Sequence, residues 1–295
     1  MIAEPITIDR PRSTKPRRTK AEIAEVRGAI YRFAEAQRPV SIRQTFYSLI
    51  VQGLIEKRES EYRATVGRLM REMRRSGELP YGWIGDASRW MHKRPSYLTL
   101  DAALEHAAAS YRKAVWDDQD VLVQVWIEKE ALASVVFQET DPWDVPLYVV
   151  KGFSSMTYLY GAAEDVKDAG KPVYVYYFGD FDPSGMDIER VIEKDLRGFG
   201  LDGLLTFERM SVTESQIARW GLPTRPPKAS DSRAKHWGNK PCVELDALRP
   251  ADLRRLVRLC IDNHIDKDRL AALKLVEAEE REKFKRLVER RTWER

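Results

Sequence analysis

Three acidic residues stand where two apolar stretches of the sequence end. Glu128 follows the run VLVQVWI, and Asp180 and Asp182 follow PVYVYYF in the segment GDFDPSG. Such runs are typical of buried strands in a parallel sheet, and the active sites of these sheets lie at the carboxyl ends of the strands. Clustered carboxylates repel one another unless a cation neutralises them, and their hard oxygens suit Mg²⁺. The spacing therefore predicts that these three carboxylates converge on a Mg²⁺ site.

A purely structural role for the two aspartates is the alternative. Asp180 and Asp182 precede an expected helix at about residues 185–198, so they could form an Asx turn and cap that helix. Gly185 would let the chain turn directly into the helix. An Asp-x-Asp pair alone is weak support for a metal site. The Glu-Lys pair that ends the earlier strand, at Glu128, favours the metal site over the cap.

Arg43 and Tyr47 form a second candidate site on the expected helix IRQTFYSLIVQ, which Ser41 caps. The buried stripe of this helix is expected to consist of Ile42, Phe46, Leu49 and Ile50. Arg43 and Tyr47 are i, i+4 neighbours beside that stripe. A guanidinium next to a phenol favours the phenolate and can hold a phosphate. A tyrosine with a pKa near 10 needs such help to act as a nucleophile at neutral pH. In the alternative, Tyr47 packs with its hydroxyl in solvent.

A basic face is expected on a third helix, from about Glu59 to Gly77. Its apolar positions follow helical spacing and would face the core: Val66, Leu69, Met70 and Met73. Arg68, Arg71 and Arg75 fall on the opposite face, where they could contact DNA phosphates. An ordinary amphipathic surface helix is the alternative.

Composition and charge narrow the class of protein. The chain has 295 residues, 43% hydrophobic and 33% charged, and a net charge of +4 with basic patches at residues 1–20 and 57–75. Such patches suit a polyanion such as nucleic acid. Cys242 and Cys260 form no CxxC pair, which argues against a disulfide scaffold or a zinc finger. No apolar run approaches the roughly 20 residues of a membrane span, and no secretory signal is recognisable, so we expect a cytoplasmic protein.

The order of elements predicts an α/β fold with a helical N-terminal module. Three helices precede the segment ELPYGWIGDASRW, expected to be a short ribbon or loop, which is the pattern of a winged helix. Four apolar strands are then expected at residues 121–127, 146–150, 172–178 and 204–207. Helices at about 129–139, 154–168 and 185–198 separate them, which indicates a parallel sheet covered on both faces.

Three segments resemble the Toprim domain, the Mg²⁺-binding α/β module of topoisomerases, primases and some nucleases: IEKEAL (127–132), GFSSMT (152–157) and GDFDPSGMDI (179–188). The chain is most similar to the A subunit of topoisomerase VI and its meiotic double-strand-break relatives. These carry a winged-helix domain before the Toprim domain, with the nucleophilic tyrosine in an Arg-x-x-Tyr/Phe-Tyr motif. Arg43 to Tyr47 fits that motif, whereas Tyr62 and Tyr81 lie outside it.

The resemblance divides the chain into five parts. They are a basic flexible arm (1–20), a winged-helix DNA-binding domain (21–94), a helical connector (95–118), a Toprim domain (119–215), and a basic loop with two C-terminal helices (216–295). It implies Mg²⁺ on Glu128, Asp180 and Asp182, and a homodimer in which the tyrosine of one subunit meets the metal of the other. The chain lacks a nucleotide-binding motif, so an ATP-driven reaction would need a separate ATPase subunit.

The expected function is therefore Mg²⁺-dependent cleavage of double-stranded DNA through a phosphotyrosine intermediate, with or without rejoining, as in a type IIB topoisomerase. The chain is similar to the small stand-alone A-like proteins of bacterial mobile elements and phages. A Toprim-type nuclease, in which the metal activates water, is the first alternative. A non-catalytic DNA-binding protein is the second.

Overall fold

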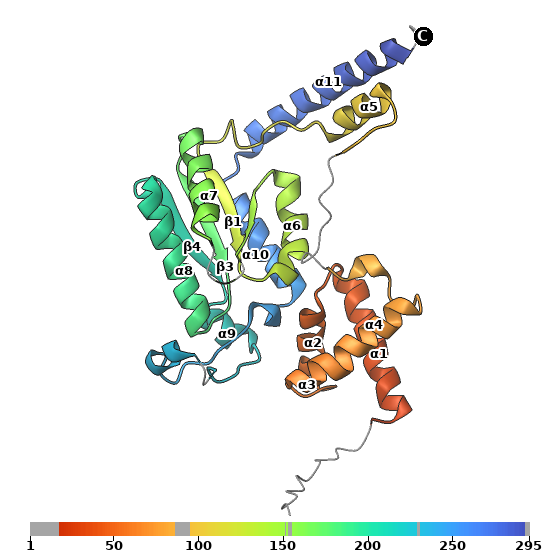
Figure 1. Cartoon of the computed structure of the whole chain (residues 1–295), viewed down its shortest axis with the longest axis vertical. Coiled ribbons are helices and arrows are strands. Elements are labelled where there is room, and N and C mark those ends of the chain that lie inside the picture. Colours follow the sequence, from red (N-terminus) through yellow and green to blue (C-terminus); the bar gives the residue numbers. More distant parts are fainter. Residues whose placement is uncertain (1–17, 86–94, 151, 153–154, 229–230, 293–295) are drawn as a thin grey trace, which may run out of the picture.

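The computed structural model describes residues 18–85, 95–150, 152, 155–228 and 231–292, with side chains as far as residue 286. Figure 1 shows a helical N-terminal part, an α/β part, and a pair of helices that projects from the α/β part. Most of the expected flexible arm (1–20) lies outside the described residues. No helix in the described part of the chain is long and apolar enough to cross a membrane.

The N-terminal part contains the three helices that the sequence predicts. Their segments are α1 (Lys20–Gln37), α2 (Ile42–Val51), α3 (Glu59–Glu61), a π-helical turn (Tyr62–Gly67) and α4 (Arg68–Arg75). Thr19 and Ser41 are the N-caps of α1 and α2, and each is completed by a reciprocal capping box with Glu22 or Gln44. The two predicted helix starts are therefore confirmed.

The third helix is continuous from α3 to α4, with the π-helical turn in its middle. Its expected core positions, Val66, Leu69, Met70 and Met73, are all buried. Arg68, Arg71 and Arg75 are exposed, as expected. After α4 the described chain forms a single 3₁₀ turn (Tyr81–Trp83) and an isolated bridge between Val40 and Ile84. The rest of the expected ribbon or loop, from residue 86, lies outside the described residues.

The connector is only partly helical, which corrects the sequence prediction. Helix α5 (Leu100–Ser110) ends at Tyr111, and the chain then runs without helix towards the sheet. Side chains from elsewhere in the sequence bind backbone N–H groups of this stretch. Asp144 accepts a hydrogen bond from the Val115 N–H at 3.2 Å, and Glu277 accepts one from Lys113 at 3.0 Å. These long-range partners replace the carbonyls of a continuing helix.

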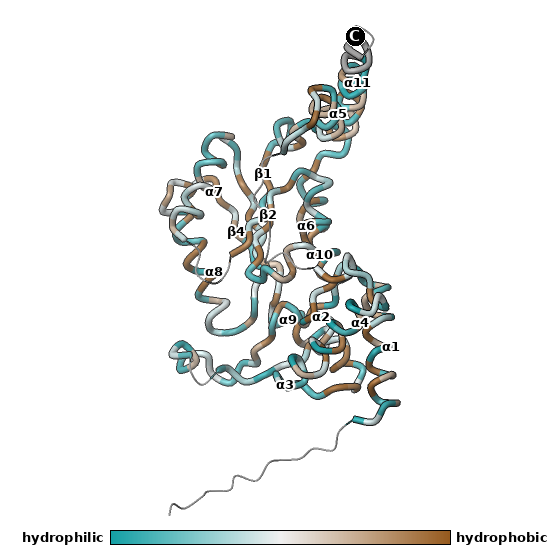
Figure 2. The backbone as a smooth tube through the Cα atoms, turned by 45° about the vertical axis from the view of Figure 1, so that its right-hand side comes forward, coloured by the Kyte–Doolittle hydropathy of each residue, from teal (hydrophilic) through white to brown (hydrophobic). Residues whose placement is uncertain are grey.

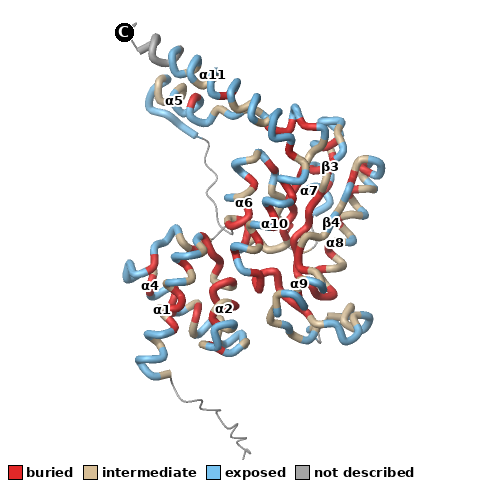
Figure 3. Tube along the Cα trace, turned by 180° about the vertical axis from the view of Figure 1, so that it is seen from behind, coloured by how far each residue is buried: buried red, intermediate tan, exposed pale blue. Residues whose placement is uncertain are grey.

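The α/β part is built on a sheet of parallel strands in the order β2-β1-β3-β4. The strands are β1 (Leu122–Ile127), β2 (Leu147–Val149), β3 (Val173–Phe178) and β4 (Leu205–Ser211). Helices α7 (Met156–Ala169) and α8 (Pro183–Leu196) cover one face, and α6 (Ala133–Thr140) and α10 (Pro250–Asp262) cover the other (Figure 1). The strands carry much of the hydrophobic sequence (Figure 2), and buried residues run along β3 (Figure 3). The predicted α/β class is confirmed.

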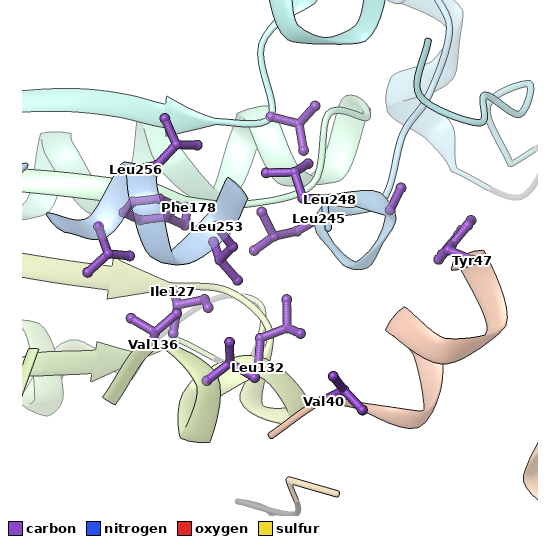
Figure 4. Close-up of a cluster of buried hydrophobic side chains, with 14 of the residues drawn as sticks. Val40, Tyr47, Ile127, Leu132, Val136, Phe178, Leu245, Leu248, Leu253 and Leu256 are labelled. Atoms are coloured by element: carbon purple, nitrogen blue, oxygen red, sulfur yellow. The ribbon is translucent and has the colours of Figure 1, made fainter. Parts of the chain in front are cut away.

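One cluster of buried side chains joins the N-terminal helices to the sheet. It includes Val40 and Phe46 from the N-terminal part and Ile127 and Phe178 from the strands. Leu245 and Leu248 lie between the two, in and after a short 3₁₀ turn (Leu245–Ala247), as Figure 4 shows. The cluster therefore holds Tyr47 close to the carboxyl ends of the strands.

The C-terminal third of the chain packs against both the N-terminal part and the α/β part. It contains α9 (Glu214–Trp220), a 3₁₀ turn (Ser232–His236), α10 and the long α11 (Lys267–Thr292), which packs along α5. The described part of the basic loop is anchored by a bridge between Arg225 and Cys242. That bridge places Arg225 beside the sheet edge where the acidic residues lie.

Candidate functional site

The adjacency of β1 and β3 brings Glu128 and Asp180 together. The Glu128 N–H donates to the Phe178 carbonyl at 2.9 Å, and the Asp180 N–H donates to Glu128 Oε2 at 2.9 Å. Parallel strands in register deliver their carboxyl ends to one edge. The two carboxylates that the sequence placed at these strand ends are therefore neighbours.

Asp180 is buried and both of its oxygens have partners. Oδ1 accepts a hydrogen bond from the Leu245 N–H at 2.8 Å, and Oδ2 lies 2.9 Å from Lys129 Nζ. Burial raises the pKa of Asp180 and outweighs the lowering effect of Lys129. Burial alone would lower the pKa of Lys129, but the carboxylates of Asp180 and Asp246 outweigh it and raise that pKa. Lys129 thus serves as the counterion of this buried pair of aspartates.

Asp182 caps a helix, which is the structural role that the sequence offered as the alternative to metal binding. Its Oδ1 accepts a hydrogen bond from the Gly185 N–H at 2.8 Å and caps α8, with Pro183 in the first turn. Its Oδ2 accepts a hydrogen bond from Arg225 at 2.9 Å. A Cβ at Gly185 would lie 2.3 Å from the Asp180 carbonyl oxygen, so glycine is needed where the helix starts this close to the strand end.

Within the described residues, no group of three or more His, Cys, Asp or Glu side chains is placed to hold a metal ion. Lys129 and Arg225 supply positive charge to Asp180 and Asp182 where Mg²⁺ was expected. Mg²⁺ binding by Glu128, Asp180 and Asp182 stays a prediction.

Glu128 is largely buried beside Asp180, and its carboxylate accepts the Asp180 N–H. Burial, with the Asp180 carboxylate as the second cause, raises the pKa of Glu128 to about 7. Because this pKa lies above the unfolded value of 4.5, the fold loses stability as the pH rises from about 4.5 to 7, and the full penalty is present above 7. Below the unfolded pKa, Glu128 is protonated in both the folded and the unfolded state, so it does not lower the free energy of unfolding.

We therefore expect Glu128→Gln to raise the free energy of unfolding at pH 8 by about 1–3 kcal/mol. The gain should shrink to near zero at pH 4, below the unfolded pKa. Urea denaturation in EDTA at both pH values measures it, with the exposed Glu25→Gln as the matched control. Equal stability of wild type and Glu128→Gln at pH 8 would contradict the raised pKa assigned to Glu128 from its burial and from Asp180.

Tyr47 lies in the wall of a basic cavity of about 390 Å³. Its side chain is buried, with 4% of its surface exposed. The cationic residues around the cavity are Arg43, Lys57, Arg58 and Arg225. The Lys57 ammonium lies 5.4 Å from the centre of the Tyr47 ring and donates to the Pro223 carbonyl at 2.7 Å. Residues on α2, on the turn after it and on the basic loop therefore form one cationic pocket.

The pKa of Tyr47 is raised, and the sequence prediction of a lowered pKa was wrong. Burial is the largest cause and the negative charge of Glu244 the second, whereas Arg43 lowers the pKa by less. Arg43 shares its charge between two carboxylates, with Glu59 at 2.9 Å and Glu244 at 3.1 Å. In this state Tyr47 is a neutral phenol that needs a base to become a nucleophile.

Glu244 connects the tyrosine to the acidic end of the sheet. Its carboxylate interacts with the Tyr47 hydroxyl and lies 3.7 Å from Arg225 Nε. Arg225 in turn binds Asp182. Tyr47 and Asp182 therefore belong to one network of charged groups within a single chain.

Sequence reasoning missed Lys129, Arg225, Glu244 and Asp246 as parts of this site. The segment VELDAL offered a signal, because its four apolar residues indicate a buried segment and Glu244 and Asp246, which are both buried, lie among them. Burial raises the pKa of Asp246 to about 6. Arg225 offered no such signal, since it lies in a loop rich in charge and proline.

Neither the models of known protein families nor the curated proteins contain a match to this chain.

Proposed function

We propose that this protein cleaves DNA by transesterification, with Tyr47 as the nucleophile. The observation that carries the proposal is the basic cavity, in which the phenol lies among four cationic side chains and beside the carboxylate of Glu244. A cationic pocket of this kind suits a phosphodiester and the extra negative charge of its transition state. The Toprim-like and winged-helix-like assignments from the sequence agree with this function and are part of the proposal.

The reaction uses groups that already lie together. Arg43, Lys57 and Arg225 bind the phosphate in the basic cavity. The Tyr47 hydroxyl loses its proton to Glu244, and its oxygen forms a bond to phosphorus. The bond from phosphorus to one deoxyribose oxygen breaks, and that oxygen takes a proton from water. The product is a phosphotyrosine, and the reverse step rejoins the strand.

The proposed substrate is double-stranded DNA, because the basic face of α4 stands exposed on the same N-terminal part of the chain. Arg68 pairs with Glu72 at 2.8 Å on the helix surface, and Arg71 and Arg75 are also exposed. A homodimer, Mg²⁺ and a separate ATPase subunit stay predictions from the resemblance. The network from Tyr47 to Asp182 also offers a site within one chain, so cleavage need not depend on a partner's residues.

A plasmid-cleavage assay tests the proposed function. Supercoiled plasmid is incubated with the protein in Mg²⁺ or in EDTA, denatured, and treated with protease or left untreated before electrophoresis. We expect cut DNA that enters the gel normally only after protease treatment, because protein stays attached to it. Cut DNA with free ends would favour the nuclease that uses water. Bound but uncut DNA would favour the non-catalytic DNA-binding protein.

DNA binding should weaken steeply with salt. Each phosphate contact contributes about 0.9 to the slope of log affinity against log salt. We expect Arg68→Ala, Arg71→Ala and Arg75→Ala together to reduce that slope by about two to three. Fluorescence anisotropy of a labelled duplex over a range of salt measures it. A slope equal to that of the wild type would place the DNA path away from α4.

A further inference from the structure

A second cavity, of about 500 Å³, shares Tyr47 with the basic cavity. It lies between α1, α2, the end of α9 and the start of α10, and much of its wall is apolar. Phe33 and Trp220 contribute aromatic rings, and Leu222 and Leu248 contribute aliphatic side chains. The cavity has the size and character of a site for a small planar molecule or part of one.

Two amide groups on the wall of this cavity have unused hydrogen-bonding atoms. Gln44 is 1% exposed, and its Oε1 accepts the Ser41 N–H at 3.0 Å, which fixes the orientation of the amide. Its Nε2 donor is buried and has no hydrogen-bond partner among the described residues. The buried Oε1 acceptor of Gln37 likewise lacks one there. Buried polar groups are normally paired, and both atoms have almost no accessible surface, so a ligand in the cavity pairs with them only after a local side-chain rearrangement.

We propose that this cavity binds a nucleobase that has left the stack of the DNA, while its neighbouring phosphate lies in the basic cavity. This inference rests on the proposed function and names the form of its substrate. A base edge carries both donors and acceptors, and glutamine amides pair with such edges. Aromatic rings such as those of Phe33 and Trp220 stack on the faces of bases.

The arrangement selects for distorted DNA. A base inside a regular duplex must be unpaired and unstacked before it can enter a pocket, and this costs free energy. An unpaired or bulged base has already lost that pairing. The protein should therefore bind most tightly where a duplex contains an unpaired base.

The test compares two labelled duplexes by fluorescence anisotropy in EDTA, so that binding is measured without metal. One duplex carries a single unpaired adenine, and the other carries an abasic site at the same position. We expect the wild type to bind the adenine duplex about tenfold more tightly, the fold-change expected for stacking one base. Ala36→Trp should fill the cavity and abolish this preference, because Ala36 lines the cavity from the exposed surface of α1.

Ala24→Trp is the matched control, since Ala24 is also exposed on α1 but does not line the cavity. It should retain the wild-type preference. Val51→Trp is a second filling variant, at a position that lines the cavity and is 74% exposed, so it serves if Ala36→Trp does not fold.

The outcomes separate this inference from the proposed function. Equal binding of both duplexes by the wild type overturns the base pocket and leaves cleavage by Tyr47 standing. A preference that survives in both filling variants places the base elsewhere and overturns the assignment to this cavity. Failure of the wild type to bind either duplex overturns the proposed function together with the pocket.

Discussion

Tyr47→Phe is expected to abolish DNA cleavage and the covalent protein–DNA adduct together. Phenylalanine keeps the ring that packs against Phe46 at a centroid distance of 5.5 Å, so the fold should be preserved. It removes the only atom of this side chain that can attack phosphorus. Denaturing electrophoresis of a labelled duplex, followed by protease treatment, measures both the cut and the adduct.

Tyr62→Phe is the control for this prediction. Tyr62 also packs against Phe46, at a centroid distance of 5.5 Å, and the Arg43 guanidinium lies 4.4 Å from the centre of the Tyr62 ring. Loss of this hydroxyl should leave cleavage and adduct formation near the wild-type level. Cleavage by Tyr47→Phe with free DNA ends would refute the tyrosine mechanism and promote the hydrolytic nuclease.

Local patterns predicted the framework of the site well. The β-branched and aromatic runs that precede Glu128 and Gly179 became β1 and β3, and Ser41 became the N-cap of α2. These features depend on neighbours within a few residues, which a sequence displays directly. The meeting of Glu128 with Asp180 followed as well, because parallel strands share an edge.

The electrostatics of the site could not be predicted in the same way. Arg43 and Tyr47 are one helical turn apart, which suggested that the guanidinium would lower the pKa of the phenol. The partner that decides otherwise, Glu244, lies 201 positions from Arg43 in the sequence. Arg225 reaches Asp182 across 43 positions. Only the folded chain shows that these charged groups lie together. The size of each group's effect on the pKa of Tyr47 then depends on how deeply the groups are buried.

Burial also explains the positive side chains at the edge of the sheet where the acidic residues lie. Asp180 is too deeply buried to stay ionised without a counterion, and Lys129 provides one at 2.9 Å. An Asp180→Asn change would leave Asp246, at 3.7 Å, as the nearest carboxylate to Lys129 among the described residues. Removing charge at Asp180 therefore costs a buried ion pair, whereas removing charge at Glu128 relieves the cost of burying that charge and its repulsion with Asp180. The sequence alone could not distinguish these two carboxylates.

Glu244→Gln is expected to slow cleavage at neutral pH by about 10²–10⁴-fold, the usual contribution of a general base. The amide keeps the shape of the side chain but cannot accept the phenol proton. The change also removes a negative charge that raises the pKa of Tyr47, so this pKa should fall while burial still keeps it above its ordinary value. Cleavage by the variant should therefore recover as the pH rises, because the phenolate then forms without a base. Rates of adduct formation from pH 6 to 10 measure this.

Glu59→Gln is the matched control for this prediction. Glu59 is the other carboxylate bound to Arg43, at 2.9 Å, but its side chain is 53% exposed. It is not among the main causes of the raised pKa of Tyr47. If Glu244 acts only by holding Arg43 in place, the two variants should slow cleavage to a similar extent and neither should recover at alkaline pH. If Glu244 is the base, only Glu244→Gln should show the large loss and its alkaline recovery, while the affinity for DNA stays close to that of the wild type. The shape of the pH profile therefore separates a proton acceptor from a group that merely positions the guanidinium.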